Sequence, residues 1–118
     1  MAGFESHVKD AVSRADQNPI GVFTEAVPVD SNEETSVTAL PNQMLFVDAE
    51  DNPVTVTLPE PTANTSVVVK KLDSTGNAVT IETPVGTQTI DGSASDRTIT
   101  GENVSREVAS DGSNYFII

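Results

Sequence analysis

The chain has no cysteine and a single histidine, and both shortages restrict the chemistry open to it. Without cysteine there is no disulfide and no thiolate for a metal, and the sequence leaves the redox compartment open. A Ser-His-Asp triad would have to use His7, near the start of the chain. A lone histidine is more often a solvated or capping residue than a metal ligand. We therefore expect no metal, no cofactor and no enzymatic activity.

Long apolar runs and phosphate-binding loops are missing as well. No apolar run approaches the length of a membrane-spanning helix, and the N-terminus lacks the basic and then apolar layout of a signal peptide. Gly86, Gly92 and Gly101 lack the Lys-Ser or Lys-Thr that follows the glycine of a phosphate loop. We expect a soluble protein that is not exported by a signal peptide, with these glycines in turns.

Basic residues are scarce, since six Lys and Arg stand against 18 Asp and Glu and the net charge is −12. Such a surface repels nucleic acid and anionic membranes, because binding to either relies on Lys and Arg. One interpretation is an ordinary acidic soluble protein. The other is adaptation to high salt, since molar salt screens charges beyond about 3 Å and removes the repulsion among carboxylates. The small number of lysines (Lys9, Lys70 and Lys71) favours the second interpretation.

The charged residues form no obvious site. The acidic stretches 30–34 and 48–52 lack the alternating oxygen ligands and the central glycine of a calcium loop, so we interpret them as solvated turns. No carboxylate stands in an apolar context that would raise its pKa. Lys70 and Lys71 are adjacent in a predicted strand, so their side chains point to opposite faces. Each is expected to pair with nearby acids, or alternatively to contact an acidic partner.

The first 18 residues have a helical period. Their apolar residues recur at steps of three and four and form one stripe: Phe4, Val8, Ala11, Val12 and Ala15. Asn18-Pro19 ends the pattern, because the residue before proline is pushed out of the helical region. The sequence predicts a helical arm over 1–18, a hinge at 18–21 and a β domain over 19–118. A helix this short needs a surface to pack on, either its own sheet or a neighbouring subunit.

The rest of the chain reads as strands and turns. β-branched runs bounded by Gly, Pro, Asn or Asp cover 20–29, 35–40, 44–48, 53–59, 66–72, 78–81, 89–92 and 110–118. Val54, Val56 and Leu58 alternate with threonines, which predicts one buried face. Pro28 indicates an edge or an exit from its strand. Residues 73–77 are predicted to reverse the chain in a tight turn. The sequence therefore predicts an all-β meander of eight or nine strands in a single β-sandwich or jelly-roll-like domain, with no evident internal repeat.

Several of these segments together resemble a known family. Leu58-Pro59, a lysine-bearing strand, Asp73-Ser-Thr-Gly-Asn-Ala-Val-Thr-Ile81, Thr89-Ile-Asp-Gly92 and Ser110-Asp-Gly-Ser-Asn-Tyr115 follow one another in this order. The order resembles the small β domains of tailed-virus structural proteins, which recur in tail fibres, head fibres and capsid decoration proteins. The resemblance covers residues 53–118. Tyr115 stands where such sequences often have Trp, and Lys70-Lys71 lacks a third matching polar position, so the subfamily stays open.

The resemblance implies a structural or adhesive role in a virion, commonly as a trimer and without enzymatic activity. With the acidic composition, it suggests a virus of halophilic archaea. The first expectation is a capsid decoration, turret or spike protein on the capsid exterior that contacts the major capsid protein or other virion subunits and stabilises the shell. The alternative is a tail-fibre or baseplate module that binds a host receptor. A cellular carbohydrate-binding module fits less well, because only 4% of the residues are aromatic.

The end of the sequence is predicted to contribute to assembly. Tyr115, Phe116, Ile117 and Ile118 are four consecutive apolar residues, which are expected to be sealed in a sheet or at a subunit contact. The core must be built mainly from small aliphatic residues, so a lone domain of this size would bury little apolar surface and have low stability. An intersubunit face would add buried area worth about 25 cal/mol per Å². We expect a homotrimer with assembly contacts at these residues and, on the arm, at Phe4, Val8, Ala11 and Val12; a monomer is the alternative.

Overall fold

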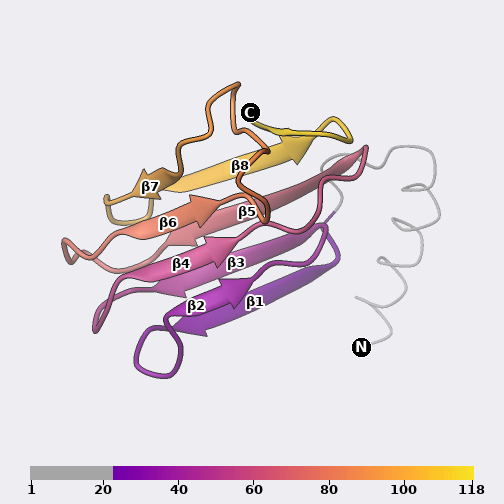
Figure 1. The fold of residues 1–118 in the computed structure, drawn as a ribbon. Coiled ribbons are helices and arrows are strands. Elements are labelled where there is room, and N and C mark those ends of the chain that lie inside the picture. Colours follow the sequence, from indigo (N-terminus) through magenta and orange to yellow (C-terminus); the bar gives the residue numbers. More distant parts are fainter. Residues whose placement is uncertain (1–22) are drawn as a thin grey trace, which may run out of the picture.

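The computed structural model describes residues 23–118, which form two mixed β-sheets (Figure 1). The all-β class is confirmed, and no helix occurs in the described range. The strands are β1 (Glu25–Asp30), β2 (Ser36–Thr38), β3 (Gln43–Asp48), β4 (Val54–Thr57), β5 (Thr65–Lys71), β6 (Val79–Glu82), β7 (Arg97–Ile99), β8 (Ser105–Ser110) and β9 (Tyr115–Ile117). The five-stranded sheet has the order β1-β3-β5-β8-β9, and the four-stranded sheet has the order β2-β4-β6-β7.

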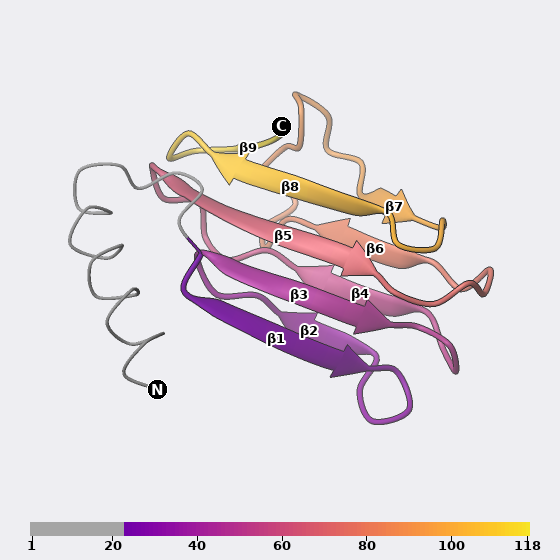
Figure 2. The same ribbon diagram turned by 180° about the vertical axis from the view of Figure 1, so that it is seen from behind.

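The chain winds as a flattened coil through its first six strands. Each strand of one sheet is followed by a strand of the other, so β1 and β2, β3 and β4, and β5 and β6 make three successive turns of the coil. Within each sheet these strands pair in parallel: β1 with β3 and β3 with β5 in one sheet, and β2 with β4 and β4 with β6 in the other. Figure 2 shows the five-stranded sheet in front, with the other sheet behind it. Parallel neighbours need a long connection, and here the strand of the opposite sheet supplies it.

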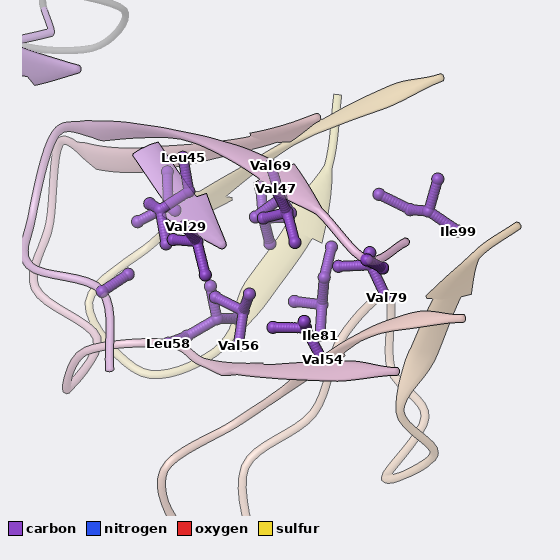
Figure 3. Packing of buried hydrophobic residues seen from close by; sticks show 14 of the residues in the cluster. Val29, Leu45, Val47, Val54, Val56, Leu58, Val69, Val79, Ile81 and Ile99 are labelled. Carbon is purple, nitrogen blue, oxygen red and sulfur yellow. The ribbon is translucent and has the colours of Figure 1, made fainter. Parts of the chain in front are cut away.

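The core lies between the two sheets. Side chains alternate along each strand, and the inward-facing half comes almost entirely from Val, Ile and Leu. Figure 3 shows Val29, Leu45, Val47 and Val69 pointing from the five-stranded sheet toward the side chains of the four-stranded sheet. Those opposite side chains are Val54, Val56, Leu58, Val79 and Ile81. Each such burial contributes about 1.5–3 kcal/mol, so the packed layer holds the two sheets together. The predicted burial of residues 54, 56 and 58 is confirmed.

The last three strands close the coil in antiparallel fashion. β7 pairs with β6, β8 pairs with β5, and β9 folds back on β8. The β8–β9 hairpin turns at Asp111-Gly112, where the Asp111 side chain accepts hydrogen bonds from the backbone of Ser113 and Asn114, both at 2.9 Å. Gly112 has a φ of 103°, a conformation that glycine adopts without strain. A second turn at Asp91-Gly92 has positive φ at both residues.

The predicted meander is wrong, whereas the predicted reversal of the chain at 73–77 does occur, between two sheets and not in a hairpin (Figure 2). Residues 73–77 carry the chain from β5 in one sheet to β6 in the other, and these two strands do not pair. β4 and β5 likewise lie in different sheets. The parallel pairing also differs from the antiparallel strand order of a jelly roll. Asp, Ser, Gly and Asn favour any sharp change of direction, so their presence does not distinguish a hairpin from a corner between layers.

The expectation of no internal repeat is also wrong. Residues 48–57 and 73–82 share Asp, Asn, Val and Thr at the same four relative positions. The structure aligns them, since Val54 lies beside Val79 and Thr55 beside Thr80. The first turn of the coil is shorter, so Val37 and Thr38 match Val56 and Thr57 only over the strand. This change of length obscured the repeat in the sequence.

Other expectations have mixed outcomes. Nine strands and the positions of β2 to β6 agree with the sequence prediction. Pro28 lies in β1, which is an edge strand as predicted, so the absence of its N–H does not cost a hydrogen bond between strands. Residues 89–92 form isolated bridges at Ile90 rather than a strand, whereas β7 and β8 had no predicted strand. The predicted arm over 1–18, the hinge and the start of the first strand at 20–22 lie outside the described residues.

Candidate functional site

The most strongly bonded polar cluster lies where the chain leaves β5. Lys71 is fully buried, and its Nζ donates to Asp73 Oδ2 at 2.6 Å and to the backbone oxygens of Asp73 and Thr75, both at 2.9 Å. Asp73 is only 6% exposed in its side chain. Its Oδ1 accepts the backbone N–H of Ala49 at 2.7 Å, and its Oδ2 accepts from the Thr75 backbone and hydroxyl. The cluster therefore ties the third turn of the coil to the second.

The pKa of the Asp73 carboxyl shows how these bonds act together. Burial alone would raise this pKa, because it penalises the charged form. Hydrogen bonds from Lys71, Thr75 and Ala49 outweigh the burial and hold the pKa well below its ordinary value. All three protons of the Lys71 ammonium have acceptors, so the group has no spare donor for a ligand. The cluster is a structural tie, and the predicted local ion pair is confirmed for Lys71; Lys70 lies on the opposite face, half-buried.

The same kind of tie recurs at each corner on this end of the coil. Asn77 Nδ2 donates to Ala49 O at 2.9 Å and to Glu50 O at 3.1 Å. One turn earlier, Asn52 Nδ2 donates to Ser31 O at 3.1 Å, and the Ser31 hydroxyl accepts from the backbone of residues 51 and 52. Each asparagine thus bonds back to the corner before it. Within the described range, every buried polar side-chain atom has a hydrogen-bond partner.

The predicted assembly residues of the C-terminal strand do not all face the same way. Tyr115 lies in the core, and its hydroxyl donates to Pro59 O at 2.6 Å. Burial raises the pKa of this hydroxyl, and the nearby negative charge of Glu60 raises it further. Ile117 packs partly against the core, whereas Phe116 is 40% exposed and Ile118 is 66% exposed. β9 is incorporated into the five-stranded sheet by its pairing with β8, and the side chains of Phe116 and Ile118 remain exposed to solvent.

The other predicted assembly residues, Phe4, Val8, Ala11 and Val12, lie outside the described residues, as does His7. Contacts between these positions and another subunit stay a prediction. Over residues 23–118, we find no pocket and no group of three or more His, Asp or Glu side chains placed to hold a metal ion. Over the same residues, no helix is long and apolar enough to cross a membrane.

The outer faces of the two sheets differ sharply in chemistry, which the sequence analysis missed. The outer positions of the four-stranded sheet carry mostly hydroxyls, and we call this the hydroxyl face: Ser36, Thr38, Thr55, Thr57, Thr80 and Thr98. The outer positions of the five-stranded sheet carry mostly apolar side chains, and we call this the apolar face: Ala26, Pro28, Met44, Phe46, Val68, Ala109 and Phe116. The signal was present, because β3 and β5 are apolar at consecutive positions, which is typical of strands covered on both sides.

Comparison with known proteins adds no relative. No protein-family model matches the sequence, and no curated protein matches it.

Proposed function

We propose that the protein is a structural component of a tailed-virus particle, displayed on the capsid exterior as a homotrimer that stabilises the shell. The observation that carries the proposal is the structural use of the segments that resemble virion β domains. Leu58 fills the core, Asp73–Asn77 ties two corners together, and the two Asp-Gly turns shape the last strands. These segments serve the framework of the body, as expected of a protein whose task is mechanical.

The hydrogen bonds between successive corners of the coil also support this role. A reinforcing subunit must keep its shape while it is held at several points, and hydrogen bonds between successive turns of a coil resist their separation. Here Asp73, Asn77 and Asn52 each join one turn to another, in addition to the parallel backbone pairing. A fully satisfied polar network also fixes one packing arrangement, because any shift would leave buried groups unpaired.

The charge supports an exposed position in a salty medium. A net charge of −12 on one chain is tolerated where salt screens it, and it keeps identical particles apart in solution. It also disfavours a location against packaged nucleic acid. The proposed partners are other copies of the chain and the major capsid protein beneath them.

The test is fractionation of particles of the virus that encodes the chain. Particles purified in molar salt and separated into heads and tails should carry the protein with the heads, in stoichiometric amounts by quantitative mass spectrometry. Particles that lack the gene for it should assemble and then lose integrity at lower temperature or lower salt. Absence of the protein from purified particles would refute the proposal.

One observation favours the second candidate, a receptor-binding module of a tail fibre or baseplate. The hydroxyl face presents rows of threonines at regular spacing, and hydroxyls both donate and accept hydrogen bonds to sugars. This function predicts that the protein separates with the tails and that purified protein binds host cells in molar salt. The variant Thr55→Val/Thr80→Val should then lose cell binding while keeping its fold.

A further inference from the structure

The apolar face carries few charges on a strongly acidic molecule. Register places Ala26, Met44 and Val68 side by side in one row, and Pro28 and Phe46 in the next. At the other edge of the sheet, Ala109 lies beside Phe116. The strand positions between them add two serines and a pair of opposite charges, Ser66, Ser105, Lys70 and Glu107, so these rows carry no net charge. One further row, at the end of β1 and β3, holds the acids Asp30 and Asp48.

The area of this face is large enough to matter. Five strands about 4.8 Å apart and six residues of about 3.3 Å rise span roughly 19 Å by 20 Å, or about 400 Å². The polar positions lie within this area, so the apolar part is smaller. The largest apolar patch on a typical soluble protein covers about 300–600 Å² and is often functional. The matching positions on the other sheet are threonine or serine, with Glu82 at the end of β6, and water solvates all of these side chains well. The same fold thus has one face suited to water and one suited to contact.

We propose that the apolar face is the surface through which copies of this chain associate. The distribution of charge favours a second copy of the chain as the partner that covers this face. Two molecules that each carry −12 repel one another, so they approach most easily where neither presents a net charge. The rows of this face that exclude Asp30 and Asp48 meet that condition. Lys70 and Glu107 lie on neighbouring strands, so each can meet the opposite charge of a rotated copy.

The inference deepens the proposed function, on whose homotrimer it rests, by naming the surface. Identical patches related by rotational symmetry satisfy one another and close without growing into fibres. Phe116 continues the same surface to the edge of the sheet, and its 40% exposure is the largest among the aromatic side chains that the structure describes. The predicted assembly role of this residue therefore becomes part of a larger contact.

The experiment measures mass in molar salt by light scattering on the full chain. The wild type should give a small multiple of 12.4 kDa, and Phe46→Glu should reduce the mass to that of a monomer. Thr55→Glu, which adds the same charge on the hydroxyl face, should keep the multiple. Because Phe46→Glu could disturb the sheet, Phe46→Thr/Val68→Thr provides a neutral second variant with strand-forming residues, and it should also be monomeric and folded by circular dichroism.

Other outcomes overturn the inference. A wild type that is monomeric at high protein concentration would refute it, and so would an assembly that survives both apolar-face variants. A monomeric wild type whose melting temperature falls in both Phe46→Glu and Phe4→Glu would place residues 1–18 of the same chain on the face. The proposed function is tested separately, because association through this face can hold for a protein that is absent from virions. A virion protein that assembles through another surface would refute only the inference.

Discussion

Asp73→Asn changes the shape of the side chain very little, yet it is expected to lower the free energy of unfolding of the domain strongly. Oδ2 of Asp73 accepts a hydrogen bond from Lys71 at 2.6 Å. The substitution either puts an NH₂ group at this position or makes the amide rotate by half a turn. In both cases the fully buried ammonium of Lys71 loses its countercharge. Loss of one member of a buried ion pair costs about 3–5 kcal/mol. A domain of this kind has only about 5–15 kcal/mol in total. With a urea m-value of about 1–3 kcal/mol per M, the unfolding midpoint should fall by at least about 1 M.

The assay is urea unfolding, since guanidinium is itself a salt and would screen the surface charges. Asp111→Asn is the matched control, because it changes the net charge equally at an exposed hairpin where asparagine also accepts the backbone bonds; it should shift the midpoint far less. Lys71→Met added to Asp73→Asn should recover much of the loss, because an apolar side chain tolerates the burial. The loss should persist in dilute and in molar salt, since buried pairs are screened little. A midpoint shift equal to that of Asp111→Asn would refute the reasoning.

Three further predictions concern salt, the N-terminal segment and pH. The melting temperature should rise markedly from dilute buffer to molar salt, because screening relieves the repulsion of a −12 chain; equal values at both would refute adaptation to high salt. Deletion of residues 1–18 should leave a soluble domain that circular dichroism shows to be folded but that no longer joins particles. A truncated protein that still joins particles would refute a role of this segment in assembly. Because burial raises the pKa of Tyr115 in the folded state, its contribution is present below about pH 10 and is lost as pH rises further. Tyr115→Phe should flatten that alkaline decline and cost about 1 kcal/mol at neutral pH through the lost bond to Pro59 O, as followed by thermal melts from pH 7 to 11.

The strands were predictable because their local signals are strong. Alternation of valine with threonine in β4 fixes which side chains are buried, and β-branched residues mark β5 and β6 without ambiguity. The pairing of the strands was not predictable from the same signals. A β-strand followed by Asp, Gly and Asn can turn back on itself or cross to another layer, and the choice depends on contacts between residues far apart in the sequence, such as Asp73 with Ala49.

The surfaces illustrate the same limit. Lys71 was placed with a nearby acid because the two residues are close in sequence. The apolar face was missed, because it gathers residues from five strands and becomes visible only once β1, β3, β5, β8 and β9 are side by side. Within each strand, an outward apolar residue looks like one more core position. The internal repeat could have been found by aligning Asp48 with Asp73, since the Asn, Val and Thr that follow then coincide.

A cryo-microscopy map of the purified particle in molar salt would show directly whether the protein lies on the capsid exterior. We expect density for residues 23–118 on the outside of the capsid, with three copies around each site. The apolar face of the five-stranded sheet should be turned toward neighbouring copies and the hydroxyl face toward solvent. Counting copies per shell then gives the stoichiometry. A fully resolved particle with no such density on head or tail would show that the protein is not a virion component.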